Sequence, residues 1–157
     1  MRILVLSDSH GRADRLSEII FRFPDIKHIF FLGDNLRDIE EAAGVHPDKI
    51  YYSVKGNCDF GETAETSGEA ILGGTRIFYT HGHNFGVKYS YDSLLAAAKN
   101  AGAKIALYGH THIADIKYEE GVYIINPGSV AQSRSGAESF CIIDISTAGI
   151  LPNIIEV

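Results

Sequence analysis

Side chains that could bind metal ions follow several short apolar segments of this chain. His110 and His112 come directly after the apolar run Ile105–Tyr108 and are separated by one residue, so both imidazoles can reach one small volume. Neutral imidazole is the commonest metal ligand in proteins. Two surface histidines in a loop would fit this segment equally well, so the choice depends on the rest of the chain.

The same arrangement, an apolar run that ends in glycine-flanked polar residues, recurs elsewhere in the sequence. The residues concerned are Asp8 and His10, Asp34, Asn57, and His81. Each alone is weak, because an Asp or Asn after a strand usually makes a turn and a lone histidine is more often structural. In open α/β sheets, ligands bind beyond the carboxyl ends of the strands. Five such strand ends together favour a metal site over a set of turns.

The types of these side chains predict two metal ions. Two aspartates, one asparagine and four histidines are too many for one tetrahedral zinc and suit two ions that share a carboxylate. Mixed oxygen and nitrogen ligands favour Mn, Fe, Ni, Co or Zn over Mg or Ca. Two divalent ions would outweigh two carboxylates and make the site locally positive, which suits an anionic substrate such as a phosphate ester. A water between the ions would be acidified into a nucleophile.

The segments that must position these residues alternate between strand and helix, and hairpins follow. Apolar spacing predicts helices over 14–23, 36–43 and 89–100. It predicts strands over 3–6, 28–32, 50–54, 70–72, 76–79, 105–108, 113–118, 122–125, 139–145 and 150–157. Within the second helix, Asp38, Glu40 and Glu41 are expected on a solvated face. We find no linker, so we expect one α/β domain over residues 1–157, with mixed sheets inside and helices outside.

Composition narrows the classes of partner. The chain has 157 residues and a net charge of −6, which argues against a basic surface for nucleic acid or for an anionic membrane. It has no long apolar run and no signal peptide, so we expect a cytoplasmic protein without a membrane partner. The two cysteines, Cys58 and Cys141, form neither a disulfide framework nor a zinc-finger spacing.

The ordered motifs resemble those of the calcineurin-like metallophosphoesterases. The motifs that carry the resemblance are Asp8-x-His10, Gly33-Asp34, Gly56-Asn57-Cys58-Asp59, His81-Gly82-His83 and Gly109-His110-x-His112. The short length and the turn Asn126-Pro127-Gly128-Ser129 are similar to the small YfcE-type prokaryotic phosphodiesterases. The resemblance spans nearly the whole chain. It implies a four-layer α/β/β/α sandwich of two mixed sheets flanked by helices.

The resemblance also implies roles for individual residues. Position by position, Asp8, His10 and His112 would hold one metal, Asn57, His81 and His110 would hold the second, and Asp34 would bridge them. The implied catalytic residues are Asp34, Asn57, His83 and Asp59. Further candidates are Arg12, Ser129 and Arg134. The implied cofactors are two divalent ions, manganese first, with nickel, iron, cobalt or zinc as alternatives.

One residue departs from the family pattern. Many relatives have a histidine after the asparagine, where it is thought to protonate the leaving group, and here Cys58 occupies that position. A thiol is a weak hydrogen-bond donor, so it is in question whether Cys58 can protonate the leaving group. Cys141 lies inside an apolar segment and is expected in the core.

These observations predict a dinuclear, metal-dependent phosphodiesterase that hydrolyses small-molecule phosphodiesters through a metal-bridging hydroxide. The alternative is a metal-binding interaction scaffold of the same fold, like the retromer subunit. A nuclease is disfavoured by the acidic balance, and no nucleic acid duplex is expected as partner. A homodimer or homotetramer is possible.

Overall fold

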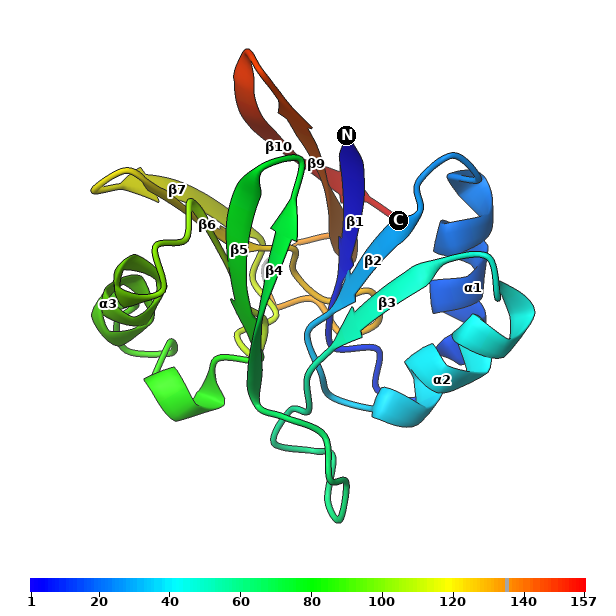
Figure 1. The fold of residues 1–157 in the computed structure, drawn as a ribbon. Coiled ribbons are helices and arrows are strands. Elements are labelled where there is room, and N and C mark those ends of the chain that lie inside the picture. The colour runs from blue at the N-terminus through cyan, green and yellow to red at the C-terminus, as the bar shows by residue number, and fades with distance from the viewer. Residues whose placement is uncertain (135) are drawn as a thin grey trace.

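The computed structural model describes residues 1–134 and 136–157 and arranges them in layers: two helices, two sheets and a third helix (Figure 1). The predicted architecture, two mixed sheets flanked by helices, is confirmed. In Figure 1, α1 and α2 cover the outer face of one sheet, and α3 covers the outer face of the other.

The first sheet has the strand order β10-β9-β1-β2-β3. Its three parallel neighbours are β1 (Arg2–Leu6), β2 (His28–Phe31) and β3 (Ile50–Ser53). The final hairpin, β9 (Ser139–Ser146) and β10 (Gly149–Glu156), joins the sheet antiparallel to β1. The crossovers between the parallel strands are α1 (Ala13–Arg22) and α2 (Leu36–Val45).

The second sheet has the strand order β4-β5-β6-β8-β7. Its strands are β4 (Ser67–Leu72), β5 (Thr75–Thr80), β6 (Ile105–Leu107), β7 (Asp115–Glu119) and β8 (Val122–Asn126). Strands β5, β6 and β8 are parallel, and β4 and β7 pair antiparallel at the two edges. The short 3₁₀ helix η1 (His83–Phe85) and α3 (Asp92–Asn100) connect β5 to β6.

Side-chain alternation along β1 shows how the layers are held together. Leu4 and Leu6 pack against α1 and α2, whereas Ile3 and Val5 face the second sheet, because successive side chains of a strand point to opposite faces. Cys141 lies in the same core between the sheets, as expected. A strand buried on both faces is continuously apolar, which is why this segment shows no polar alternation.

The third helix is shorter at its start than the sequence pattern predicts. It begins at Asp92 rather than at Tyr89, and the Tyr89 side chain is exposed. The buried residues of α3 are Leu94, Leu95 and Ala98, and they pack in the same apolar core as β6 and β8. Within the described residues, no helix is both long and apolar enough to cross a membrane.

We predict that Phe30→Ala strongly destabilises the protein. Phe30 is fully buried between the sheets and stacks on Tyr52 with ring centroids 4.6 Å apart. Truncating a buried phenylalanine costs about 3–5 kcal/mol in the free energy of unfolding. Urea denaturation should show this loss, whereas Phe21→Ala, at a side chain that is 77% exposed, should change stability little. Equal effects of the two substitutions would contradict the packing described here.

Candidate metal centre

The loops that follow the parallel strands of both sheets meet at one end of the molecule, the lower edge in Figure 1. Backbone hydrogen bonds join them: Asp8 N–H donates to Gly33 O at 3.0 Å, and Gly109 N–H donates to His81 O at 3.0 Å. The His110 N–H donates to Asp8 Oδ2 at 3.1 Å and thereby connects the two sheets. All seven candidate metal ligands lie on these loops and form two adjoining clusters.

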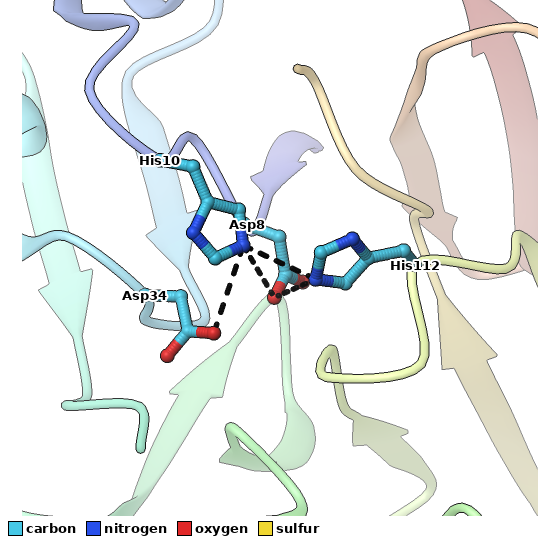
Figure 2. Close-up of side chains that lie close together, drawn as sticks. All are labelled: Asp8, His10, Asp34 and His112. Carbon is cyan, nitrogen blue, oxygen red and sulfur yellow. Dashed lines mark hydrogen bonds and ion pairs between the residues drawn. The ribbon is translucent and has the colours of Figure 1, made fainter. Parts of the chain in front are cut away.

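The first cluster consists of Asp8, His10, Asp34 and His112 (Figure 2). One ligand atom from each of these residues lies within 4.8 Å of the others. The Nε2 atoms of His10 and His112 are 3.2 Å apart, and His112 Nε2 is 3.2 Å from Asp8 Oδ1. His10 Nε2 lies 3.7 Å from Asp34 Oδ2. The four side chains therefore surround one small volume.

The second cluster lies on the other side of the Asp34 carboxylate. His81 Nε2 is 3.5 Å from Asp34 Oδ1, 3.1 Å from Asn57 Oδ1 and 3.2 Å from His110 Nδ1. The two oxygens of Asp34 thus face different clusters, Oδ2 the first and Oδ1 the second. The carboxylate therefore lies between the two clusters.

Hydrogen bonds to the backbone orient the buried histidines. His81 Nδ1 donates to Leu32 O at 2.7 Å, and His112 Nδ1 donates to Gln132 O at 2.7 Å. A carbonyl can only accept, so each Nδ1 carries a proton, and the Nε2 atom of each ring faces the cluster. Such outer hydrogen bonds fix the tautomer and raise ligand basicity at metal sites.

The hydrogen bonding of Asp8 also fits a bound cation. Asp8 Oδ1 is buried and accepts no hydrogen bond from the described residues, although a buried polar atom without a partner is costly. Burial alone would raise the pKa of this carboxyl, but His112, His81 and Ser7 outweigh it and hold the pKa below its usual value. Asp8 is therefore an anion, and its Oδ1 faces the Nε2 atoms of His10 and His112 at 4.0 and 3.2 Å.

The imidazoles of the centre differ in pKa. Burial, reinforced by the charges of His81 and Lys88, lowers the pKa of His110 to about 4. The neighbouring Asp8 carboxylate raises the pKa of His112 despite burial. His110 is consequently neutral at pH 7, which is the form that binds metals.

The backbone at the centre is unusual. Non-glycine residues seldom adopt positive φ, and where they do, the strain of about 1–3 kcal/mol each is concentrated at functional sites. Five candidate ligands do so: Asp8 (φ 55°), His10 (44°), Asp34 (60°), His110 (67°) and His112 (60°). The left-handed turns direct the side chains of consecutive loops toward one another.

Asp59 holds together the loops after β2 and β3. Its Oδ1 accepts the N–H groups of Asn35 and Leu36 at 2.9 and 2.7 Å, and its Oδ2 accepts those of Asp34 and Gly56 at 3.0 and 2.7 Å. The carboxylate therefore caps the N-terminus of α2, where the helix dipole favours negative charge. With these bonds made, Asp59 positions the loop of Asp34 rather than facing the clusters.

The expectation of a solvated face holds for Glu40 and Glu41, which are exposed, but is wrong for Asp38. It is only 6% exposed, and its Oδ2 accepts Ser9 Oγ–H at 2.6 Å and Gly11 N–H at 2.8 Å. Asp38 thus anchors the loop that carries Asp8 and His10. The sequence offered one signal: Asp38 lies in the first turn of the helix that follows Asp34, close to the strand ends.

Asn126, which the sequence marked only as part of a turn, is another supporting residue. Its Nδ2 donates to Gly109 O and to Thr111 Oγ1, both at 2.9 Å, and so fixes the loop of His110 and His112. The candidate Ser129 acts in the same way, because its Oγ donates to Asp8 O at 2.8 Å.

The remaining candidates occupy different positions. The ring of His83 lies 5.3 Å from that of His81 and 6.1 Å from that of His110, and burial lowers its pKa. Arg12 forms a bidentate pair with Asp14, with both contacts at 2.8 Å. Arg134 is exposed, and its backbone N–H donates to His112 O at 3.1 Å.

Cys58 lies exposed beside the second cluster. Its backbone N–H donates to Asp34 Oδ1 at 2.9 Å, and Asn57 Nδ2 donates to its Sγ at 3.5 Å. Burial and the nearby Asp34 carboxylate raise the thiol pKa to about 11.

Two glycines allow the loops to approach closely. A Cβ on Gly56 would overlap Asp34 Oδ1 and the Asp34 backbone nitrogen, and a Cβ on Gly109 would overlap Ser7 Oγ. A larger residue at Gly56 would displace the Asp34 carboxylate, and one at Gly109 would displace the Ser7 hydroxyl and the Asp8 carboxylate. These glycines are therefore required by contact distance, since neither has a positive φ.

Comparisons with known proteins agree with this geometry. Residues 1–148 match the family model of the calcineurin-like phosphoesterase superfamily domain. The chain belongs to this superfamily.

Individual relatives are similar over most of their length. The probable metallophosphoesterase YsnB of Bacillus subtilis is 33% identical over 92% of this chain and 85% of its own. Vacuolar protein sorting-associated protein 29 of Schizosaccharomyces pombe is 30% identical over 96% and 88%. Phosphodiesterase YfcE of Escherichia coli is 28% identical over 87% and 83%.

A solved structure shares the fold closely. The crystal structure of a predicted phosphoesterase from Streptococcus pneumoniae superposes with a TM-score of 0.84, at 28% identity, over 99% of this chain and 88% of that one.

We predict that Asp59→Asn weakens metal binding while the protein stays folded. An amide offers one acceptor oxygen and turns an NH₂ group toward two backbone N–H donors, so the loop of Asp34 loses its anchor. Loss of such outer support reduces metal affinity by about 10- to 100-fold. Calorimetric titration with Mn²⁺ measures the change, and circular dichroism checks the fold. The exposed Asp25→Asn serves as control, and equal affinity of both variants would disprove the anchoring role.

Proposed function

We propose that this protein is a metal-dependent phosphodiesterase with a two-metal centre that hydrolyses small phosphodiesters. The observation that carries the proposal is the position of Asp34, whose two carboxylate oxygens face two separate sets of donors. Family membership and the similarity to YfcE phosphodiesterase support the reaction class.

The residues that would hold the ions follow from the two clusters. Asp8, His10 and His112 would hold the first, Asn57, His81 and His110 the second, and Asp34 would be shared. Mixed nitrogen and oxygen donors suit manganese, with nickel, iron, cobalt or zinc as alternatives. When bound, the ions supply Lewis acidity toward phosphoryl oxygens and lower the pKa of water.

The side chains of the protein provide orientation and charge. The carbonyls of Leu32 and Gln132 hold the His81 and His112 lone pairs toward the clusters, so little reorganisation is needed when an ion or a substrate arrives. His83 would contact a phosphoryl oxygen of the substrate, because its ring adjoins His81 and His110. Asp59 would act indirectly, by holding the loop of Asp34 in position.

We predict two bound ions per chain, and loss of both in Asp34→Asn. The amide presents one oxygen and no charge, so it cannot serve both clusters. Metal analysis after reconstitution with Mn²⁺ counts the ions, and Asp25→Asn should retain two. One ion in the wild type, or two in Asp34→Asn, would refute the shared carboxylate.

We further predict that His10→Ala and His110→Ala each abolish most hydrolysis and each lose one ion. Both histidines lie on loops beyond the strands, so circular dichroism should show a native fold. The assay compares bis(para-nitrophenyl) phosphate with para-nitrophenyl phosphate after reconstitution ion by ion, and we expect the diester to be preferred. His46→Ala is the control, because His46 bonds to Ser17 outside the centre. Wild type that binds two ions but hydrolyses neither ester would favour the interaction scaffold.

A further inference from the structure

A hollow of about 280 Å³ opens beside the second cluster. The residues that line it are Asn35, Arg37, Cys58, Asp59, Phe60 and Glu62. We refer to it as the Phe60 hollow. None of the candidate metal ligands lines it, so it is a separate feature of the surface.

Two residues that line the hollow are sequence neighbours of candidate metal ligands. Asn35 follows Asp34, and Cys58 follows Asn57, so two wall residues are direct neighbours of ligands that face the second cluster. Cys58 N–H also donates to Asp34 Oδ1 at 2.9 Å. The hollow thus adjoins the loops that carry Asp34 and Asn57.

The walls of the hollow have the chemistry of an aromatic subsite. Phe60 is 88% exposed, so the face of its ring is open to a partner. The Arg37 side chain is 83% exposed, and its Nε is 3.9 Å from Glu62 Oε1, at the limit of an ion pair. A phenylalanine ring pairs favourably with another ring, and a planar guanidinium stacks on aromatic faces.

A second hollow, of about 400 Å³, lies near α3 and contains the exposed Tyr89. One of its lining residues is Thr111, which lies between His110 and His112 in the sequence. The Thr111 hydroxyl is engaged with Asn126 Nδ2 at 2.9 Å and Ile113 N–H at 3.2 Å, on the supporting side of the loop. No neighbour of Asp34 lines it, so the Phe60 hollow is the better extension of the site.

We propose that the Phe60 hollow binds an ester group that carries a flat aromatic ring, with the ring stacked on Phe60 and Arg37. The proposal rests on the phosphodiesterase function proposed above and specifies its substrate class. It makes phosphodiesters with an aryl or nucleoside group better substrates than purely aliphatic ones.

Binding of stable analogues tests the hollow without hydrolysis. Calorimetry compares phenylphosphonate with methylphosphonate on the Mn²⁺-loaded wild type and on Phe60→Leu, Arg37→Gln and Tyr89→Leu. We expect Phe60→Leu to reduce the affinity for phenylphosphonate by about 3- to 10-fold, because a ring–ring pair is lost. The affinity for methylphosphonate should stay unchanged. Arg37→Gln should shift the same ratio in the same direction. Tyr89→Leu should change neither affinity.

Kinetics then test the substrate class. Bis(para-chlorophenyl) phosphate and bis(hexafluoroisopropyl) phosphate have leaving groups of similar acidity, and only the first carries rings. The preference for the aryl ester, measured as the ratio of kcat/KM values, should fall about 3- to 10-fold in Phe60→Leu. An unchanged ratio, or a loss in Tyr89→Leu instead, would overturn the proposal. If the Mn²⁺-loaded wild type hydrolyses neither diester, the proposed function fails. The phosphonate affinities alone then test whether the Phe60 hollow binds an aromatic ring.

Discussion

The centre depends on one constraint: a single carboxylate, that of Asp34, must face two clusters of donors at once. Its Oδ2 lies 3.7 Å from His10 Nε2 and its Oδ1 lies 3.5 Å from His81 Nε2, so a rotation or shift that improved one contact would lengthen the other. The surroundings hold it in place. Asp59 fixes the backbone of Asp34, and the N–H of Cys58 binds Oδ1. The rigid core between two sheets then supports both loops.

Burial and charge together explain why this centre suits cations and, through them, anions. Asp8 and Asp34 are almost fully buried carboxylates in a chain that is already negative overall. Two buried negative groups so close together are unfavourable without positive partners. Divalent ions would compensate both and leave a local excess of positive charge, which would attract a phosphate ester despite the acidic surface. The proposed metal binding and substrate preference would thus have one electrostatic origin.

Enzyme and interaction scaffold differ in what they require of this region. A scaffold needs a stable surface, whereas hydrolysis needs donors that are oriented before the substrate arrives. The positive φ of five candidate ligands is a costly strain, and a surface alone needs neither this strain nor the orienting hydrogen bonds of His81 and His112. They favour the enzyme, although this chain is similar both to phosphodiesterase YfcE and to vacuolar protein sorting-associated protein 29.

The sequence by itself determined the alternation of strands and helices and the types of donor at each strand end, because both follow from local order along the chain. It did not determine which polar groups are buried. The helical pattern predicts a solvated Asp38, but the loop of Asp8 covers this residue, and its carboxylate accepts hydrogen bonds from that loop. Helical spacing shows which side chains share a face, and only tertiary structure decides whether that face meets water or another loop. The supporting roles of Asp59 and Asn126 could not be predicted for the same reason, because their partners are backbone groups of distant segments.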